Sequence, residues 1–210
     1  MGTLFYIYPM LQKIPISLII LRFAIAFVAP YIAYQNGHYA SVILFWLMIA
    51  GFLSDFFDGY SARLLSVSTE RLRRLDTTVD RFFWVGLLAS IVLLYPDFIA
   101  SKLILISIII TFEIVNHLLC LLRFKKGLAL HAIIAKFWGI SLVLAFSDLL
   151  LTGHSAYLFD ASLILGIIAQ TEGFLIVLVL REWNHDIPTL VHAIKIRQGK
   201  EIKRHKIFNG

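Results

Sequence analysis

The chain alternates long apolar runs with short polar connections. Six runs each approach the roughly 20 residues that an α-helix needs to cross the hydrocarbon core of a bilayer. These runs occupy residues 15–34, 40–62, 76–95, 102–122, 129–151 and 158–180. The pattern predicts an all-α integral membrane protein, a bundle of six transmembrane helices in a single domain (1–210). A bundle of buried helices in a soluble protein is the alternative.

Composition favours the membrane interpretation. Hydrophobic residues make up 60% of the 210 residues, the mean hydropathy is +0.84 and only 15% of the residues are charged. A soluble domain carries about 25% charged residues. The segment 1–14 is aromatic, contains Pro9 and is followed directly by Pro15, so we expect it to lie at the membrane interface rather than to span.

The basic residues predict the orientation. Fifteen of the 19 Lys and Arg residues fall on one side of the runs, whereas the connections 35–38, 96–101 and 152–160 on the other side have none. By the positive-inside rule, both termini and the polar stretch between the second and third runs are cytoplasmic. We expect a multi-pass membrane protein, in the inner (cytoplasmic) membrane if bacterial, with a basic cytoplasmic tail at 181–210. That tail either lies on the membrane surface or is simply solvated.

The net charge of +6 fits basic loops that attract anionic lipid headgroups or anionic substrates. We therefore expect membrane lipids, and no nucleic acid, as partners.

Four aspartates border the polar stretch between the second and third runs. Asp55 and Asp58 are three residues apart and Asp76 and Asp80 four apart, so each pair shares one face of its helix. Because the chain turns back between the pairs, we expect all four carboxylates to converge near the cytoplasmic ends of two neighbouring helices. Convergent carboxylates repel unless a cation lies between them, and oxygen ligands without His or Cys suit Mg²⁺, Mn²⁺ or Ca²⁺.

Such a site would suit phosphoryl transfer. A Mg²⁺-type ion keeps part of its coordination shell for phosphate oxygens, and the nearby arginines add phosphate contacts. Gly59 and Ala62 leave the helix face bare, so a ligand could approach the backbone closely. The alternatives are aspartates that only cap helices or pair with arginines, and a small cation transporter that uses the aspartates as a transit site.

The stretch from Asp55 to Asp80 resembles the signature of the CDP-alcohol phosphatidyltransferases, D-x2-D-G-x2-A-R-x8-G-x3-D-x3-D. Seven of its eight fixed positions are present at the correct spacing, and the eighth, a glycine, is Leu72 here. Ile14–Arg22 is similar to the family's first-span pattern P-N-x-x-T-x-x-R, with isoleucines at the Asn and Thr positions. Later family patterns are matched in part, so the resemblance covers the whole chain but is strongest over 55–80.

The resemblance implies that an alcohol attacks the β-phosphorus of CDP-diacylglycerol and that CMP leaves, with one or two Mg²⁺ or Mn²⁺ ions as cofactors. Carried over by position, the metal ligands are Asp55, Asp58, Asp76 and Asp80. The nucleotide would be bordered by Asp55, Gly59, Ala62 and Arg63. Asp80 would also be the catalytic base that deprotonates the acceptor hydroxyl. Leu72 and Ile19, which depart from the family patterns, would alter nucleotide contacts rather than the chemistry. A reaction with a CDP-activated head group and a lipid alcohol stays open.

Basic residues near the ends of the later runs could bind the phosphate of an acceptor such as glycerol 3-phosphate or another polyol phosphate. They are Lys136, Arg123 and Arg181. Alternatively, they anchor the protein by extending their side chains to the headgroups. Lys136 is placed about two turns into the fifth run, where a lysine is costly, which favours a functional role for it.

Polar residues inside the fourth run predict an interhelical hydrogen-bond network: Glu113, Asn116 and His117. Arg22 in the first run could join this network or support the metal site. Gly166 and Gly173 in the sixth run could pack against a second copy of the chain, giving a homodimer, or within one subunit.

Overall fold

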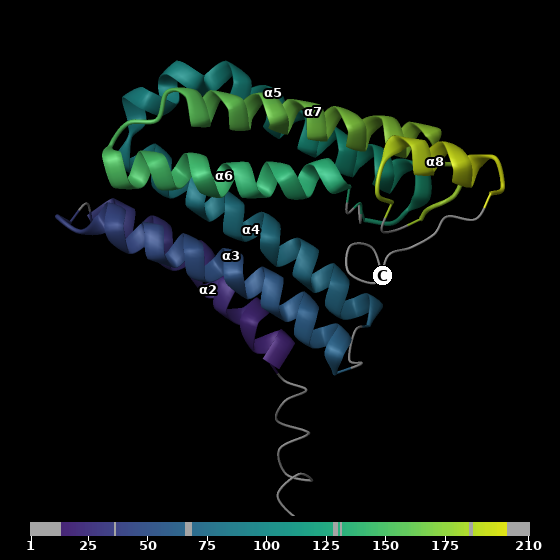
Figure 1. The fold of residues 1–210 in the computed structure, drawn as a ribbon, viewed down its shortest axis with the longest axis horizontal. Coiled ribbons are helices and arrows are strands. Elements are labelled where there is room, and N and C mark those ends of the chain that lie inside the picture. Colours follow the sequence, from purple (N-terminus) through teal and green to yellow (C-terminus); the bar gives the residue numbers. More distant parts are fainter. Residues whose placement is uncertain are drawn as a thin grey trace, which may run out of the picture. The chain divides into compact units, whose positions relative to one another are not determined.

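The computed structural model describes residues 14–35, 37–65, 69–127, 130, 132–184 and 187–200, except the side chains at 62–64, 70, 71 and 73. All regular structure in these residues is helical (Figure 1). Six of the described helices are long and apolar enough to cross a membrane: α2 (Ile14–Gln35), α3 (Ala40–Leu64), α4 (Glu70–Leu94), α5 (Pro96–Phe124), α6 (Ile133–Thr152) and α7 (Tyr157–Val179). The prediction of an all-helical chain with six helices that could span a membrane is confirmed. Residues 1–13 of the proposed interfacial segment lie outside the described residues.

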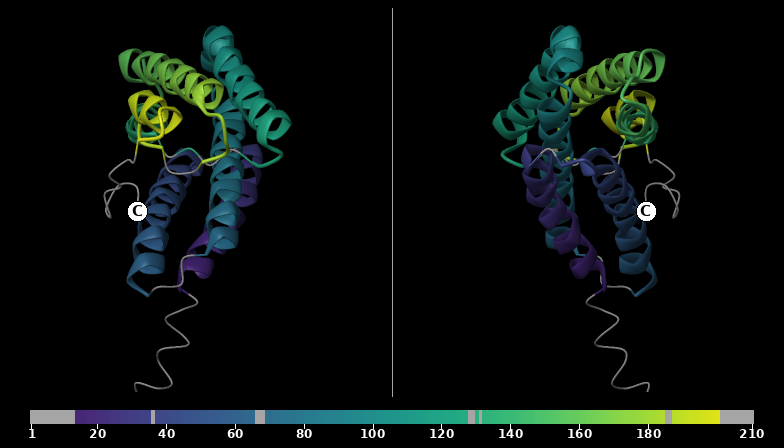
Figure 2. Two further views of the ribbon diagram at one scale, coloured as in Figure 1. Left: turned by 90° about the vertical axis from the view of Figure 1, so that its right-hand side faces the viewer. Right: turned by 90° about the vertical axis from the view of Figure 1, so that its left-hand side faces the viewer.

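The chain forms two compact units, residues 1–99 and 100–210. In the first unit, α2 packs along both α3 and α4, as the two views of Figure 2 show. Two glycines allow the helices of this unit to approach closely. A Cβ atom at Gly86 of α4 would overlap the backbone carbonyl of Ala26 on α2, and one at Gly51 of α3 would overlap the ring of Phe83 on α4. The α2–α4 contact is thus a backbone-to-backbone approach that needs glycine.

Gly86→Ala is expected to destabilise the protein although alanine is the better helix former. The clash with a backbone atom can be relieved only by moving α2, and overpacking of this kind costs about 1–3 kcal/mol, more than the ~1 kcal/mol that the helix propensity of alanine returns. Gly139→Ala in α6 is the matched control, because a Cβ there has no neighbour within 4 Å. Thermal unfolding in detergent should show a lower Tm for the first variant and an unchanged or higher Tm for the second. Equal Tm values for the two would contradict the close α2–α4 contact.

In the second unit, α6 and α7 pack side by side (Figure 1). They are joined at Gly153, which ends α6 in the left-handed conformation with φ 73°. The short helix α8 (Leu190–Arg197) packs against α7, and its Ala193 is fully buried together with Ile187 and Ile176. Part of the predicted basic tail is therefore folded onto this unit, and residues 201–210 lie outside the described part.

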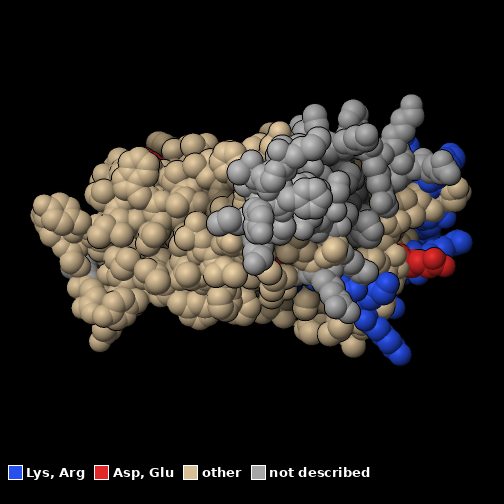
Figure 3. Space-filling view, turned by 90° about the horizontal axis from the view of Figure 1, so that it is seen from below, with Lys and Arg blue, Asp and Glu red and all other residues tan. Residues whose placement is uncertain are grey.

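The surface of the described residues is largely apolar. The described residues on the face in Figure 3 are mostly neither basic nor acidic. Large apolar residues such as Ile104 and Leu122 of α5 are 78% and 80% exposed. Exposed apolar surface of this extent is typical of helices that face lipid rather than water.

Three helix starts differ from the sequence prediction. α4 begins at Glu70 and not near residue 76. α5 begins at Pro96 and not near residue 102, because proline and then Asp97 suit the first turn of a helix. α6 begins at Ile133 and not near residue 129. Ala132, just before it, has extended backbone and is buried in the core of this unit, so this apolar residue packs without being helical. Lys136 therefore lies in the first turn of α6, and its predicted depth of two turns was wrong.

Candidate active site

Two helices of the first unit bring the four aspartates of the sequence motif together. Asp55 and Asp58 lie near the end of α3, and Asp76 and Asp80 lie near the start of α4. Thr69 fixes the start of α4, because its side chain accepts a 3.2 Å hydrogen bond from the backbone N–H of Leu72. This N-cap satisfies one of the free N–H groups at the helix start and sets where the face with the two aspartates begins.

Arg22 of α2 contacts all four carboxylates. Its Nη1 donates to Oδ1 of Asp55 at 2.6 Å and to Oδ1 of Asp80, and its Nη2 donates to Oδ1 of Asp76 at 2.6 Å and to Oδ2 of Asp58. Each of the two nitrogens thus joins one carboxylate from α3 to one from α4. The sequence left two roles open for Arg22, and the structure places it in the aspartate cluster.

Burial differs across the cluster. The side chains of Arg22 and Asp58 are 0% and 4% exposed, whereas those of Asp76, Asp80 and Asp55 are 25%, 31% and 47% exposed. The Asp58 side of the cluster is therefore buried, and the Asp55 side is accessible from outside. A ligand from outside would meet Asp55 first.

Three of the carboxylates are placed to share a cation. Asp55, Asp76 and Asp80 each offer an oxygen, and these oxygens lie within 4.8 Å of one another. Oxygen-only donors suit hard divalent cations such as Mg²⁺ and Mn²⁺. Four carboxylates against one guanidinium also leave an excess of negative charge, which a divalent cation would offset. The residues present therefore fit a divalent cation; a ligand role for Asp58 stays a prediction.

The predicted nucleotide-binding residues continue along α3 from the aspartates. Gly59 follows Asp58 directly and is partly buried, and the hydroxyl of Ser61 donates a 3.1 Å hydrogen bond to the backbone carbonyl of Asp58. Ala62 and Arg63 lie on the last turn of α3, and their side chains are outside the described part. Leu72, the departure from the family signature, is partly buried in the first turn of α4.

The three predicted acceptor-binding residues belong to the second unit. Arg123 donates hydrogen bonds to the backbone carbonyls of Val177, Leu178 and Leu180, at 2.8, 2.7 and 2.9 Å. It thereby satisfies carbonyls at the end of α7, a role that sequence reasoning missed. Lys136 and Arg181 are both exposed. Acceptor binding by these residues stays a prediction.

Glu113 and Asn116 of the predicted polar network join α5 to α7, whereas the buried Nδ1 of His117 has no hydrogen-bond partner among the described residues. Asn116 donates to the backbone carbonyl and the side-chain oxygen of Gln170, at 3.0 and 2.9 Å, and Gln170 donates to Glu113 at 2.7 Å. The space beside Gly166 of α7 is filled by a side chain of the same unit, since a Cβ there would lie 2.6 Å from Nε1 of Trp138. This contact accounts for Gly166 without a second copy of the chain.

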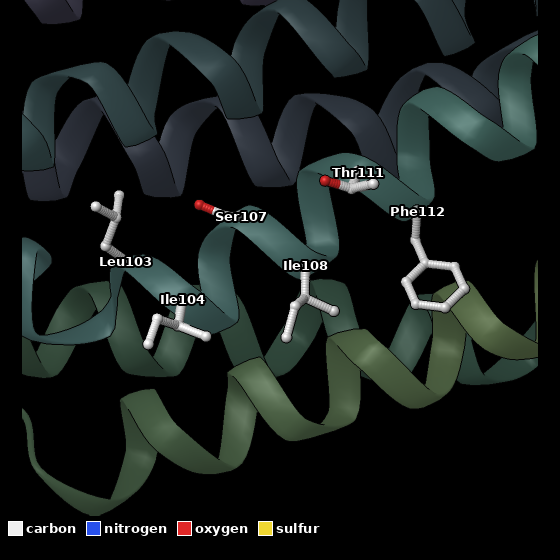
Figure 4. Close-up of a pocket in the computed structure, with 6 residues that line it drawn as sticks. All are labelled: Leu103, Ile104, Ser107, Ile108, Thr111 and Phe112. Atoms are coloured by element: carbon white, nitrogen blue, oxygen red, sulfur yellow. The ribbon is translucent and has the colours of Figure 1, made fainter.

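A groove of about 500 Å³ lies along one face of α5 (Figure 4). Its lining residues are Leu103, Ile104, Ser107, Ile108, Thr111 and Phe112. Two hydroxyls are its only polar side chains, so the groove offers neither a base nor a metal ligand for a reaction.

The family model described as CDP-alcohol phosphatidyltransferase matches residues 12–180 of the chain. This match includes all four aspartates and Arg22. No curated protein and no solved structure matches the chain.

Proposed function

We propose that this chain, an enzyme belonging to the CDP-alcohol phosphatidyltransferase family, moves a phosphatidyl group from CDP-diacylglycerol to a small hydroxyl acceptor and releases CMP. The observation that carries the proposal is the four-carboxylate cluster at the adjoining ends of α3 and α4, three of whose members can share a cation. Such a cluster at the end of two apolar helices suits a lipid diphosphate, whose acyl chains lie in the bilayer and whose phosphates lie at its surface. The positive-inside rule puts this surface on the cytoplasmic side.

A divalent cation bound by the carboxylates would offset the charge of the diphosphate and make its phosphorus a better electrophile. Asp55, Asp58 and Asp76 would hold it, together with Asp80. The bare face at Gly59 and Ala62, with Arg63, would border the cytidine diphosphate.

Asp80 would accept the proton of the acceptor hydroxyl. The acceptor oxygen then forms a bond to the β-phosphorus, and the bond from that phosphorus to the bridging oxygen breaks, so that its electron pair leaves with CMP. Asp80 contacts Arg22 and is partly exposed, so its carboxylate is held in position while its other side can meet a substrate.

For the acceptor we propose glycerol 3-phosphate or another polyol phosphate, bound through Lys136, Arg123 and Arg181. Arg123 and Lys136 belong to the later stretches of the chain that resemble the family's patterns only in part, and both resemble basic positions of those patterns. A phosphate on the acceptor offers these cations a strongly charged anion, which free inositol lacks and which exceeds the single carboxylate of serine.

Lys136→Ala is expected to raise the acceptor KM about tenfold or more while kcat changes little, because it removes a charge that binds the ground state and the transition state alike. Lys102→Ala is the matched control: Lys102 pairs with Asp160 at 2.5 Å and is predicted to lie near the opposite membrane face. Its KM should stay as in the wild type. An unchanged KM in Lys136→Ala would remove this residue from the acceptor site.

The transporter interpretation makes a different prediction. A transporter of divalent cations would carry Mn²⁺ into sealed liposomes and release no CMP from CDP-diacylglycerol. The family match favours the enzyme.

A further inference from the structure

Arg22 is a buried charge in the apolar span of α2. Its side chain is 0% exposed, and its neighbours along the helix are apolar, from Ile19 to Ala26. An arginine in a membrane span is costly unless partners offset its charge. The four aspartates provide these partners, and among the described residues its Nε has no hydrogen-bond partner at all. The aspartate cluster is therefore what holds the Arg22 side chain in place.

The aspartate cluster in turn depends on Arg22, as the geometry of the contacts shows. Nη1 joins Asp55 of α3 to Asp80 of α4, and Nη2 joins Asp58 of α3 to Asp76 of α4. The planar guanidinium can bridge two pairs at once, which a single ammonium nitrogen does less well. Arg22 thus cross-links the two helices that carry the site, from a third helix that packs along both.

Four carboxylates at this spacing repel one another and would push α3 and α4 apart at their adjoining ends. A divalent cation would offset this repulsion only when it is bound. Arg22 is part of the chain and is present at every metal concentration.

We propose that Arg22 is the resident counter-cation of the aspartate cluster: it keeps the four carboxylates assembled without metal, and its positive charge lowers their affinity for a divalent cation. The inference rests on the metal site of the proposed function. It makes Arg22 a positioning residue, with the consequence that folding of the wild type does not depend on metal.

The test is thermal unfolding of Arg22→Gln, in detergent and without substrate, in EDTA and in Mn²⁺ at a concentration near the wild-type Kd, where binding to the wild type adds little stability. Glutamine keeps polar atoms at the site but removes the charge. In EDTA the Tm should fall by about 10 °C, as expected for breaking a buried ion pair in a chain of this size, and Mn²⁺ should restore most of the loss. The wild-type Tm should change little between the two conditions. In EDTA, the Tm of Arg22→Lys should lie between those of Arg22→Gln and the wild type, because lysine keeps the charge but not the two-nitrogen bridge.

Phe83→Leu is the control for a general stabilising effect of Mn²⁺. Phe83 is buried between α3 and α4, so its truncation lowers the Tm. Mn²⁺ should not restore it, because no charge has been removed. If Mn²⁺ fails to raise the Tm of Arg22→Gln, or raises the Tm of Phe83→Leu equally, Arg22 is only a packing residue and the inference is wrong. Arg22→Gln that folds only in Mn²⁺ supports it, and a variant that folds in neither condition contradicts it.

Binding of Mn²⁺, followed by electron paramagnetic resonance, supplies the second readout. Without the competing charge, Arg22→Gln should bind Mn²⁺ about 100-fold more tightly, towards the upper end of the usual range of coupling between two sites. Unchanged or weaker binding would overturn the inference. Neither readout uses CDP-diacylglycerol. Absent CMP release in the wild type would therefore refute the proposed function alone, whereas CMP release without restoration by Mn²⁺ would refute the role of Arg22 alone.

Discussion

Asp80→Asn is expected to reduce CMP release by about 10²–10⁴-fold, the range that a positioned general base contributes. An amide keeps the size and one oxygen of the side chain, but it cannot take up the proton of the acceptor hydroxyl. The loss should persist at saturating Mn²⁺ and saturating acceptor, since occupancy of the site is not what the variant lacks. The measurement is kcat for CMP release from CDP-diacylglycerol.

Asp80 also belongs to the group of oxygens that could hold a cation, so Mn²⁺ binding by the variant has to be measured in parallel. A variant that binds Mn²⁺ and nucleotide but releases no CMP separates the base from the ligand role. Turnover near that of the wild type would remove Asp80 from the mechanism as a base.

Asp76→Asn is expected to differ from Asp80→Asn in its response to metal, because added metal should recover part of its CMP release. Asp76 lies one turn before Asp80 on α4, and both contact Arg22, which makes the two variants a matched pair. Replacing a charged ligand by a neutral amide should lower CMP release by about 100-fold at ordinary Mg²⁺, comparable with the larger losses seen when a metal site is perturbed. Higher Mn²⁺ should recover part of it, because the base is intact. The measurement is a titration of CMP release with Mg²⁺ and Mn²⁺, and an unchanged titration curve would exclude Asp76 as a ligand.

The six spans could be predicted from sequence because a bilayer imposes both length and composition on a spanning helix. α2 and α7 agree with their predicted runs within about two residues. The predictions were less accurate where apolar residues are not helical, as at Ala132, or where a helix begins at a proline, as at Pro96. Hydropathy reports burial in an apolar medium, and it does not report backbone conformation.

The aspartate cluster was predictable because the spacings of three and four residues put each pair on one helix face. The four ion pairs of Arg22 could not be predicted in the same way. The sequence shows that an arginine lies in an apolar span, but it does not show which helices pack around that arginine. Arg123 illustrates the same limit. Its bonds to the carbonyls at the end of α7 join residues more than fifty positions apart, and no local pattern announces them.

The two units of the chain divide the proposed chemistry. The aspartates and Arg22 lie in the first unit, and the basic residues proposed for the acceptor lie in the second. The metal-dependent step and the choice of acceptor can therefore be tested by separate variants.

The central claim is that the aspartate cluster catalyses a metal-dependent exchange of CMP for an acceptor alcohol. Its most direct test is CMP release by the purified wild type from CDP-diacylglycerol in detergent, with a panel of glycerol 3-phosphate, inositol phosphate, free inositol and serine. We predict release of CMP in equal amount to new phosphodiester lipid, with a phosphorylated acceptor and with Mg²⁺ or Mn²⁺, and none in EDTA. No CMP with any acceptor in the presence of metal, or undiminished release in EDTA, would contradict the account.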